Sequence, residues 1–165
     1  MGVNDPTEAN VAEHMALAEA TPRRLAATSE GLSDDLLSQP LESGEWSAVD
    51  ILNHLRACEE VWMHSVHAIL AHDNPRLQEI HPRQWVKTVN PFTTQTFYQG
   101  LQVFTLRREA LLITLGALSL DDWAREGRID RRTHSVYSHF RRMVLHEDGH
   151  CDQIEEMLSG IVGPS

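Results

Sequence analysis

The stretch Glu45-Trp-Ser-Ala-Val-Asp-Ile-Leu-Asn-His54-Leu-Arg-Ala-Cys-Glu59 contains the clearest helix start in the chain. Ser47 is a residue type favoured at helix N-caps, and Asp50 follows three positions later, which resembles a capping box. Apolar residues then recur every three or four positions, which is the periodicity of an amphipathic helix. These are Ile51, Leu55, Cys58, Trp62, Val66 and Ile69. The pattern predicts a long helix that ends near residue 72 and turns one face to a core.

The same periodicity predicts three further long helices, over residues 7–29, from residue 93 or 94 to residue 116, and over residues 135–158. Pro22 predicts a kink or a break in the first of these, because proline lacks the N–H that a helix needs. Residues 73–92 contain three prolines and little periodicity, so they form a long connection that can cross over a bundle. Residues 127–133 are interpreted as a loop, and no segment convincingly predicts a strand. We therefore expect one all-α domain over residues 1–165, a four-helix bundle.

Composition excludes several classes of function. The formal net charge of -10 makes a nucleic-acid backbone an unsuitable partner. No run of about 18 apolar residues predicts a membrane-spanning helix. The two cysteines do not form a disulfide framework, and the residues after Met1 have neither a basic flank nor an apolar run. These features favour a cytoplasmic protein with no membrane partner.

Two histidines near the end of the chain, His146 and His150, are the most informative candidates for a functional site. The chain has ten histidines, and only these two are four residues apart. That spacing places both imidazoles on one face of a helix, where they can bind one metal ion. His54, on the predicted second helix, can supply a third ligand. Three neutral imidazoles and an open position are typical of reactive metal sites. The alternative is that each histidine hydrogen-bonds a backbone carbonyl or a water.

His146, Glu147 and His150 match the H-E-x-x-H metalloprotease motif, in which the glutamate is a general base. A protease is discounted, because the 15 residues after His150 continue the same helix and cannot fold back to supply a third ligand. Glu147 is instead interpreted as a solvated carboxylate or one that supports a metal ligand. Cys58, one turn after His54, can approach the same metal, although a small buried cysteine usually only packs.

Other polar side chains have weaker claims to a function. His139 lines the mouth of a pocket or lies in solvent. Two arginine pairs, Arg131–Arg132 and Arg141–Arg142, can bind an anionic substrate, although charges near helix ends are commonly just solvated.

Two motifs resemble those of the DinB/YfiT-like family. Residues 45–59 resemble the W-S-x-x-[DE]-[IV]-L-x-H-L start of its second helix, and residues 145–154 resemble the H-x-x-x-H-x-x-Q-I pattern of its last helix. The resemblance implies a four-helix bundle with a long connection between its second and third helices. It also implies one divalent metal, zinc or nickel, bound by one histidine of the second helix and two of the fourth. Those positions correspond to His54, His146 and His150.

The resemblance also implies a class of reaction. A metal-activated thiolate or hydroxide would attack a small electrophilic substrate, in a thiol transferase or a hydrolase. A small-molecule substrate, a low-molecular-weight thiol and a second copy of the chain are the partners that the family suggests. A non-catalytic metal-binding or stress-response protein, and a structural bundle with incidental histidines, remain alternatives. An open metal position favours the enzyme, whereas a fourth protein ligand such as Cys58 favours the non-catalytic protein.

Overall fold

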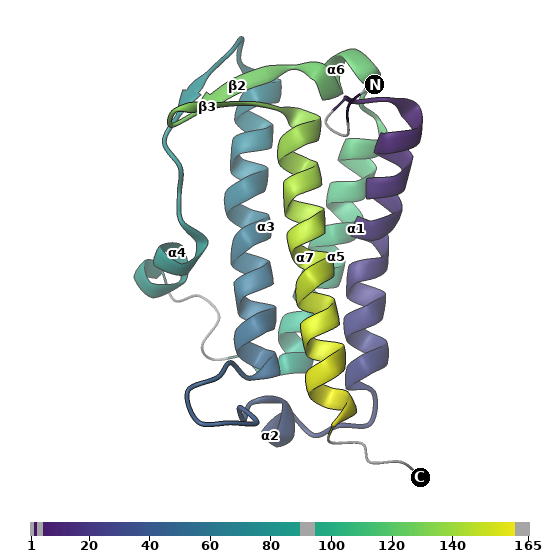
Figure 1. Ribbon diagram of the computed structural model, residues 1–165, viewed down its shortest axis with the longest axis vertical. Helices are drawn as coiled ribbons and strands as arrows, with labels where there is room; N and C mark the ends of the chain where they lie inside the picture. Colours follow the sequence, from purple (N-terminus) through teal and green to yellow (C-terminus); the bar gives the residue numbers. More distant parts are fainter. Residues whose placement is uncertain (1, 3–4, 90–94, 161–165) are drawn as a thin grey trace.

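The computed structural model describes residue 2, residues 5–89 and residues 95–160, and in it four long helices lie side by side (Figure 1). This confirms the predicted four-helix bundle. The bundle helices are α1 (Glu8–Ser29), α3 (Ala48–Ala71), α5 (Phe97–Gly116) and α7 (Val136–Ser159). The connections contain helices α2 (Asp34–Leu37), α4 (Pro82–Val89) and α6 (Leu120–Ala124), and strands β1 (Arg76–Leu77), β2 (Glu126–Ile129) and β3 (Arg132–Ser135).

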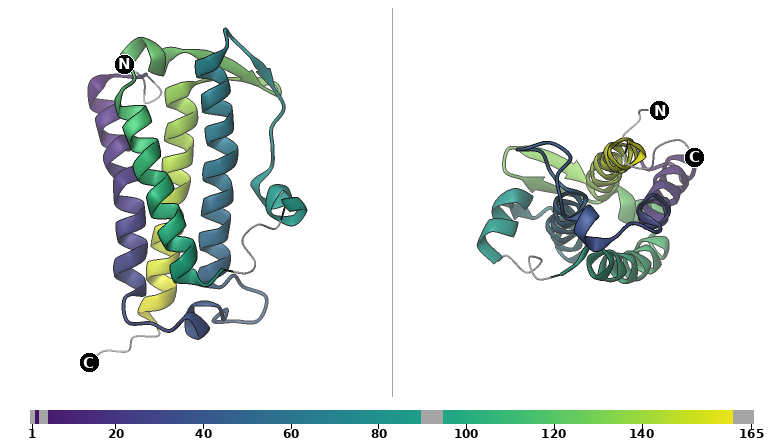
Figure 2. Two further views of the ribbon diagram at one scale, coloured as in Figure 1. Left: turned by 180° about the vertical axis from the view of Figure 1, so that it is seen from behind. Right: turned by 90° about the horizontal axis from the view of Figure 1, so that it is seen from below.

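The order of the helices in space includes a crossover. α1 and α7 run in one direction and α3 and α5 run in the other, so the chain must return along the outside of the bundle between α3 and α5 (Figure 1). β1 and α4 lie in this return, and the end-on view places α4 outside α3 (Figure 2). α7 packs against both α1 and α3. The long connection therefore places α4 beside the face where α3 meets α7.

Helix starts follow the predicted capping chemistry. Ser47 and Asp50 form a capping box at the start of α3, as predicted. α5 begins at Phe97 with Thr96 as its N-cap, slightly later than predicted, and the predicted starts at residues 93 and 94 lie outside the described residues. α7 begins after Ser135, which is the position that the pattern indicated.

The predicted break at Pro22 is wrong, because α1 continues through it to Ser29. Proline at position 22 leaves the carbonyl of Ala18 without its helical donor. The buried guanidinium of Arg108 on α5 donates to that carbonyl at 2.7 Å. A hydrogen bond from another helix therefore replaces the missing one, and the helix continues across the proline.

The prediction that the chain contains no strand is also wrong. A small sheet of order β1-β2-β3 caps one end of the bundle (Figure 1). β2 and β3 form an antiparallel hairpin around Asp130, and β1 pairs with β2 in parallel. The strands contain only two or four residues, too few for an alternating pattern to be recognised. Gly127 lies so close to α3 that a Cβ there would be 2.6 Å from Ile69 Cγ1.

Two clusters of buried apolar side chains fill the bundle. One surrounds Trp62, Trp123 and Phe140 near the sheet, and the other surrounds Ile51, Phe104 and Ile154 toward the opposite end. No helix within the described part of the chain is long and apolar enough to cross a membrane.

Candidate metal centre

The three predicted histidines lie together where α3 packs against α7. His54 comes from α3, and His146 and His150 come from successive turns of α7. The ring centroids are 5.1 Å apart for His54 and His146, 5.0 Å for His54 and His150, and 4.6 Å for His146 and His150. Residues 92 and 96 positions apart in sequence therefore meet in one cluster of imidazoles.

The nitrogen positions suit coordination of one metal ion. The Nε2 atoms of His54 and His146 are 3.3 Å apart. With Zn–N bonds of about 2.0–2.1 Å and tetrahedral angles, two coordinating nitrogens are separated by about 3.3–3.4 Å. His146 Nδ1 is buried and has no hydrogen-bond partner among the described residues. The donor set and the 3.3 Å spacing of the two Nε2 atoms fit a divalent metal between these two helices.

Cys58 lies beside the histidines, within reach of the same metal ion. Its Sγ is 3.5 Å from His54 Nε2, and the ligand atoms of His54, Cys58 and His146 lie within 4.8 Å of one another. A thiolate and an imidazole on one tetrahedral zinc are about 3.5–3.6 Å apart, so the sulfur is also placed to coordinate. Burial raises the pKa of the Cys58 thiol to about 12, however, so the thiol must lose a proton before it can bind a metal.

The imidazoles are in the protonation state that metal binding requires. Burial is the main cause that lowers the pKa of His54 to about 4, and neighbouring positive charges lower it further. The same causes lower the pKa of His146 to about 4. Both rings are therefore neutral at neutral pH and can donate a lone pair without first losing a proton.

Side chains around the histidines hold their rings in place. His150 Nδ1 donates to Gln153 Oε1 at 2.8 Å, which leaves Nε2 as the lone-pair donor. Such an outer hydrogen bond commonly orients a metal-binding histidine. Trp46 stacks on His150 with ring centroids 6.2 Å apart, and Trp62 meets the ring of His146 edge-on at 5.1 Å.

A cavity of about 520 Å³ opens beside the histidines, and His54, Cys58 and His146 form part of its wall. This volume is in the usual range for small-molecule sites. Arg83 and Arg142 also line the cavity. The space beside the candidate metal ligands is therefore large enough for a small molecule and has cationic walls.

The prediction that Glu147 is a solvated carboxylate is wrong. The residue is fully buried, and its carboxylate accepts from Arg108 Nη2 at 2.7 Å. Arg108 Nε also donates to buried Glu59 at 2.8 Å. The sequence patterns above did not single out Arg108 or Glu59 as functional residues. A signal existed for Arg108, which occupies a core position of its helix, four residues after Phe104 and three before Leu111.

Two further histidines, His139 and His64, are not part of the cluster. His139 is only 3% exposed, which corrects the prediction that it lies at a pocket mouth or in solvent. Neither of its ring nitrogens has a hydrogen-bond partner among the described residues, and burial lowers its pKa to about 3. His64 faces outward from α3. Cys58 and Cys151 are both free thiols.

Comparisons with known proteins agree with this architecture. The family model described as "DinB superfamily" matches residues 17–154. Among solved structures, YfiT from Bacillus subtilis superposes with a TM-score of 0.80 at 17% sequence identity, over 96% of this chain and 91% of that chain. That protein is described as a probable metal-dependent hydrolase with an unusual four-helix bundle topology. The superposition establishes a shared fold, and at this low identity it shows the fold alone. No curated protein matches the chain.

Proposed function

We propose that this chain, which belongs to the DinB superfamily, is a metal-dependent enzyme whose metal is bound by His54, His146 and His150. The observation that carries the proposal is the 3.3 Å separation of the Nε2 atoms of His54 and His146, with His150 adjacent on α7. Three protein ligands leave one position of a tetrahedral metal for substrate or solvent. The similarity to a probable metal-dependent hydrolase supports the same class of function.

The protein's own residues would bind and orient the reactants. Neutral imidazoles leave the full positive charge of the metal in the site, and the metal, when bound, supplies Lewis acidity that lowers the pKa of a coordinated water or thiol. Trp46 and Trp62 pack against the histidine rings and exclude water from that side. Arg83, whose Cζ lies 4.9 Å from the Trp46 ring centroid, provides a positive charge at the cavity wall.

We propose hydrolysis or thiol transfer as the reaction, with a small electrophilic substrate in the cavity of about 520 Å³. For hydrolysis, water is the nucleophile. For transfer, a low-molecular-weight thiol is the nucleophile. Zinc or nickel is the expected metal. The proposal also includes a cytoplasmic location and a homodimer. Light scattering of the purified protein gives its molar mass in solution and so tests the dimer.

A second candidate function is metal binding without turnover. The observation that favours it is Cys58 Sγ, 3.5 Å from His54 Nε2, because a coordinated thiolate would fill the position that a substrate needs. The Co²⁺-substituted protein separates the two arrangements, since thiolate coordination produces a charge-transfer band that imidazole coordination does not. Loss of such a band in Cys58→Ser would assign it to this sulfur.

Product analysis of the zinc- and nickel-loaded protein tests the proposed reaction. Ester, amide and epoxide substrates would be incubated in ¹⁸O-labelled water, with and without a small thiol, and the products weighed by mass spectrometry. Hydrolysis adds the label, whereas transfer adds the mass of the thiol. We expect one of these products from the wild type and from His64→Ala, an exposed control on α3, but not from His146→Ala. Turnover that survives His146→Ala would contradict the proposal.

A further inference from the structure

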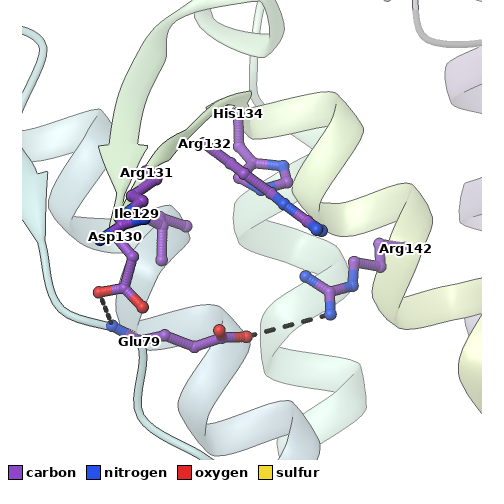
Figure 3. Close-up of a pocket in the computed structure, with 7 residues that line it drawn as sticks. All are labelled: Glu79, Ile129, Asp130, Arg131, Arg132, His134 and Arg142. Atoms are coloured by element: carbon purple, nitrogen blue, oxygen red, sulfur yellow. Dashed lines mark hydrogen bonds and ion pairs between the residues drawn. The ribbon is translucent and has the colours of Figure 1, made fainter.

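A second cavity, of about 580 Å³, lies between the β2–β3 hairpin and α7 (Figure 3). Arg131, Arg132 and His134 line it from the hairpin, and Arg142 lines it from α7. Glu79 and Arg142 line both this cavity and the one beside the histidines, so the two are neighbours. We refer to the second cavity as the arginine cavity.

The positive groups of the arginine cavity exceed its negative ones. The guanidinium groups of Arg132 and Arg142 point toward one another across it (Figure 3). The carboxylate of Glu79 lies 4.0 Å from Arg142, at the limit of an ion pair. Asp130 also lines the cavity, and its Oδ1 accepts from the backbone N–H of Glu79 at 3.1 Å, so three arginines face two carboxylates.

His134 adds a neutral polar ring to this wall. Burial is the main cause that lowers its pKa, and the charges of Arg142 and Arg132 lower it further. Both guanidinium groups are thus close enough to act on the same imidazole. A neutral imidazole can donate a hydrogen bond to an oxyanion without adding a third positive charge.

Arg142 links the arginine cavity to the candidate metal centre. Its Cζ lies 5.7 Å from the centroid of the Trp62 ring, and the same ring meets His146 at 5.1 Å. A small molecule that reaches from the histidines past Trp62 would therefore place its far end beside Arg142.

We propose that the arginine cavity is an anion subsite, in which Arg132, Arg142 and His134 bind the carboxylate or phosphate group of a small-molecule substrate. Guanidinium forks suit either oxyanion, because they can donate two parallel hydrogen bonds. Its role in positioning a substrate rests on the proposed function, whereas anion binding itself does not require the metal. Glu79 competes with the ligand, because its carboxylate lies where the ligand's oxyanion would pair with Arg142.

Titration of the metal-free protein with inorganic phosphate, and separately with succinate, tests this assignment. Backbone and arginine side-chain resonances would be followed by NMR at pH 7 and at constant ionic strength set with sodium chloride. Metal-free protein is used so that an anion cannot bind through the metal. We expect saturable shifts at Arg132, His134 and Arg142. The anion that binds more tightly identifies the group that the substrate carries, and equal binding indicates a general oxyanion site.

Three variants are expected to change the affinity for the anion in different ways. Arg132→Gln should weaken binding on the order of tenfold, because it removes a charge-assisted partner. Glu79→Gln should strengthen binding, by up to about fivefold, because it removes the competing carboxylate of a partly exposed pair. Arg23→Gln, which removes one positive charge from an exposed site on α1, should change it less than twofold, roughly the effect of a distant screened charge.

Two results would overturn the assignment. One is an absence of saturable shifts in the wild type with both anions. The other is equal weakening by Arg132→Gln and Arg23→Gln, which would mean that only the overall charge matters. Anion binding by a protein that fails to bind zinc or nickel would refute the proposed metal enzyme and leave the anion subsite intact.

Discussion

Replacing Arg108 by methionine is expected to lower the free energy of unfolding by about 3–5 kcal/mol. Arg108 is 1% exposed and donates to Glu59 at 2.8 Å, to Glu147 at 2.7 Å and to the Ala18 carbonyl at 2.7 Å. Methionine fills a similar volume but removes the ion-pair partner of buried Glu147 and leaves buried Glu59 with the more distant Arg107, 3.7 Å away. It also removes the donor that replaces the helical bond lost at Pro22. The loss is a large fraction of the roughly 5–15 kcal/mol that stabilises an ordinary domain.

Urea unfolding of the metal-free protein, followed by far-ultraviolet circular dichroism, measures this loss. Arg107→Met is the matched control, because Arg107 is partly exposed, pairs with Glu60 and lies 3.7 Å from Glu59, and its loss should cost less than about 1 kcal/mol. Adding Glu59→Gln and Glu147→Gln to Arg108→Met should recover roughly half of the loss, since neither side chain that Arg108 paired with then carries a buried negative charge. A loss for Arg108→Met no larger than that for Arg107→Met would refute the reasoning.

Two further predictions concern the other buried features. The pKa of His139 falls from 6.5 to about 3 on folding, so between these values the unfolded chain binds a proton that the folded protein does not, and stability falls as the pH falls. His139→Phe should reduce that loss by up to about 1.4 kcal/mol per pH unit, and equal pH slopes for variant and wild type in thermal or urea unfolding would contradict this. Gly127→Ala should destabilise by about 1–3 kcal/mol, because its methyl group would meet Ile69 Cγ1 at 2.6 Å. Urea unfolding measures this too, and a neutral or stabilising effect would mean that β2 does not approach α3 so closely.

The helices were predictable because they repeat a signal over many residues. The apolar period of α3 runs from Ile51 to Ile69, and local capping chemistry marks its start. The strands were not predictable, because each holds at most four residues and β1 pairs with a segment about 50 positions away. The continuity of α1 through Pro22 was hidden for a similar reason, since it depends on Arg108 from another helix.

The candidate site was predictable where helical geometry alone places the residues. The spacing of His146 and His150 puts both on one face, and His54 lies near the core stripe of its own helix. The distance from Cys58 Sγ to His54 depends on side-chain rotamers, which periodicity does not contain. The arginine cavity likewise needs the hairpin, which brings Arg132 to Arg142, and the hairpin itself was not predicted.

Metal stoichiometry tests the central claim most directly. Untagged wild type, His146→Ala and the exposed-histidine control His64→Ala would be reconstituted with zinc or nickel, dialysed and measured by inductively coupled plasma mass spectrometry. The account predicts about one equivalent in the wild type and in His64→Ala, and little in His146→Ala, because one histidine-bound ion is expected per chain. A wild type that retains neither metal, or a His146→Ala variant that retains as much as the wild type, would contradict it.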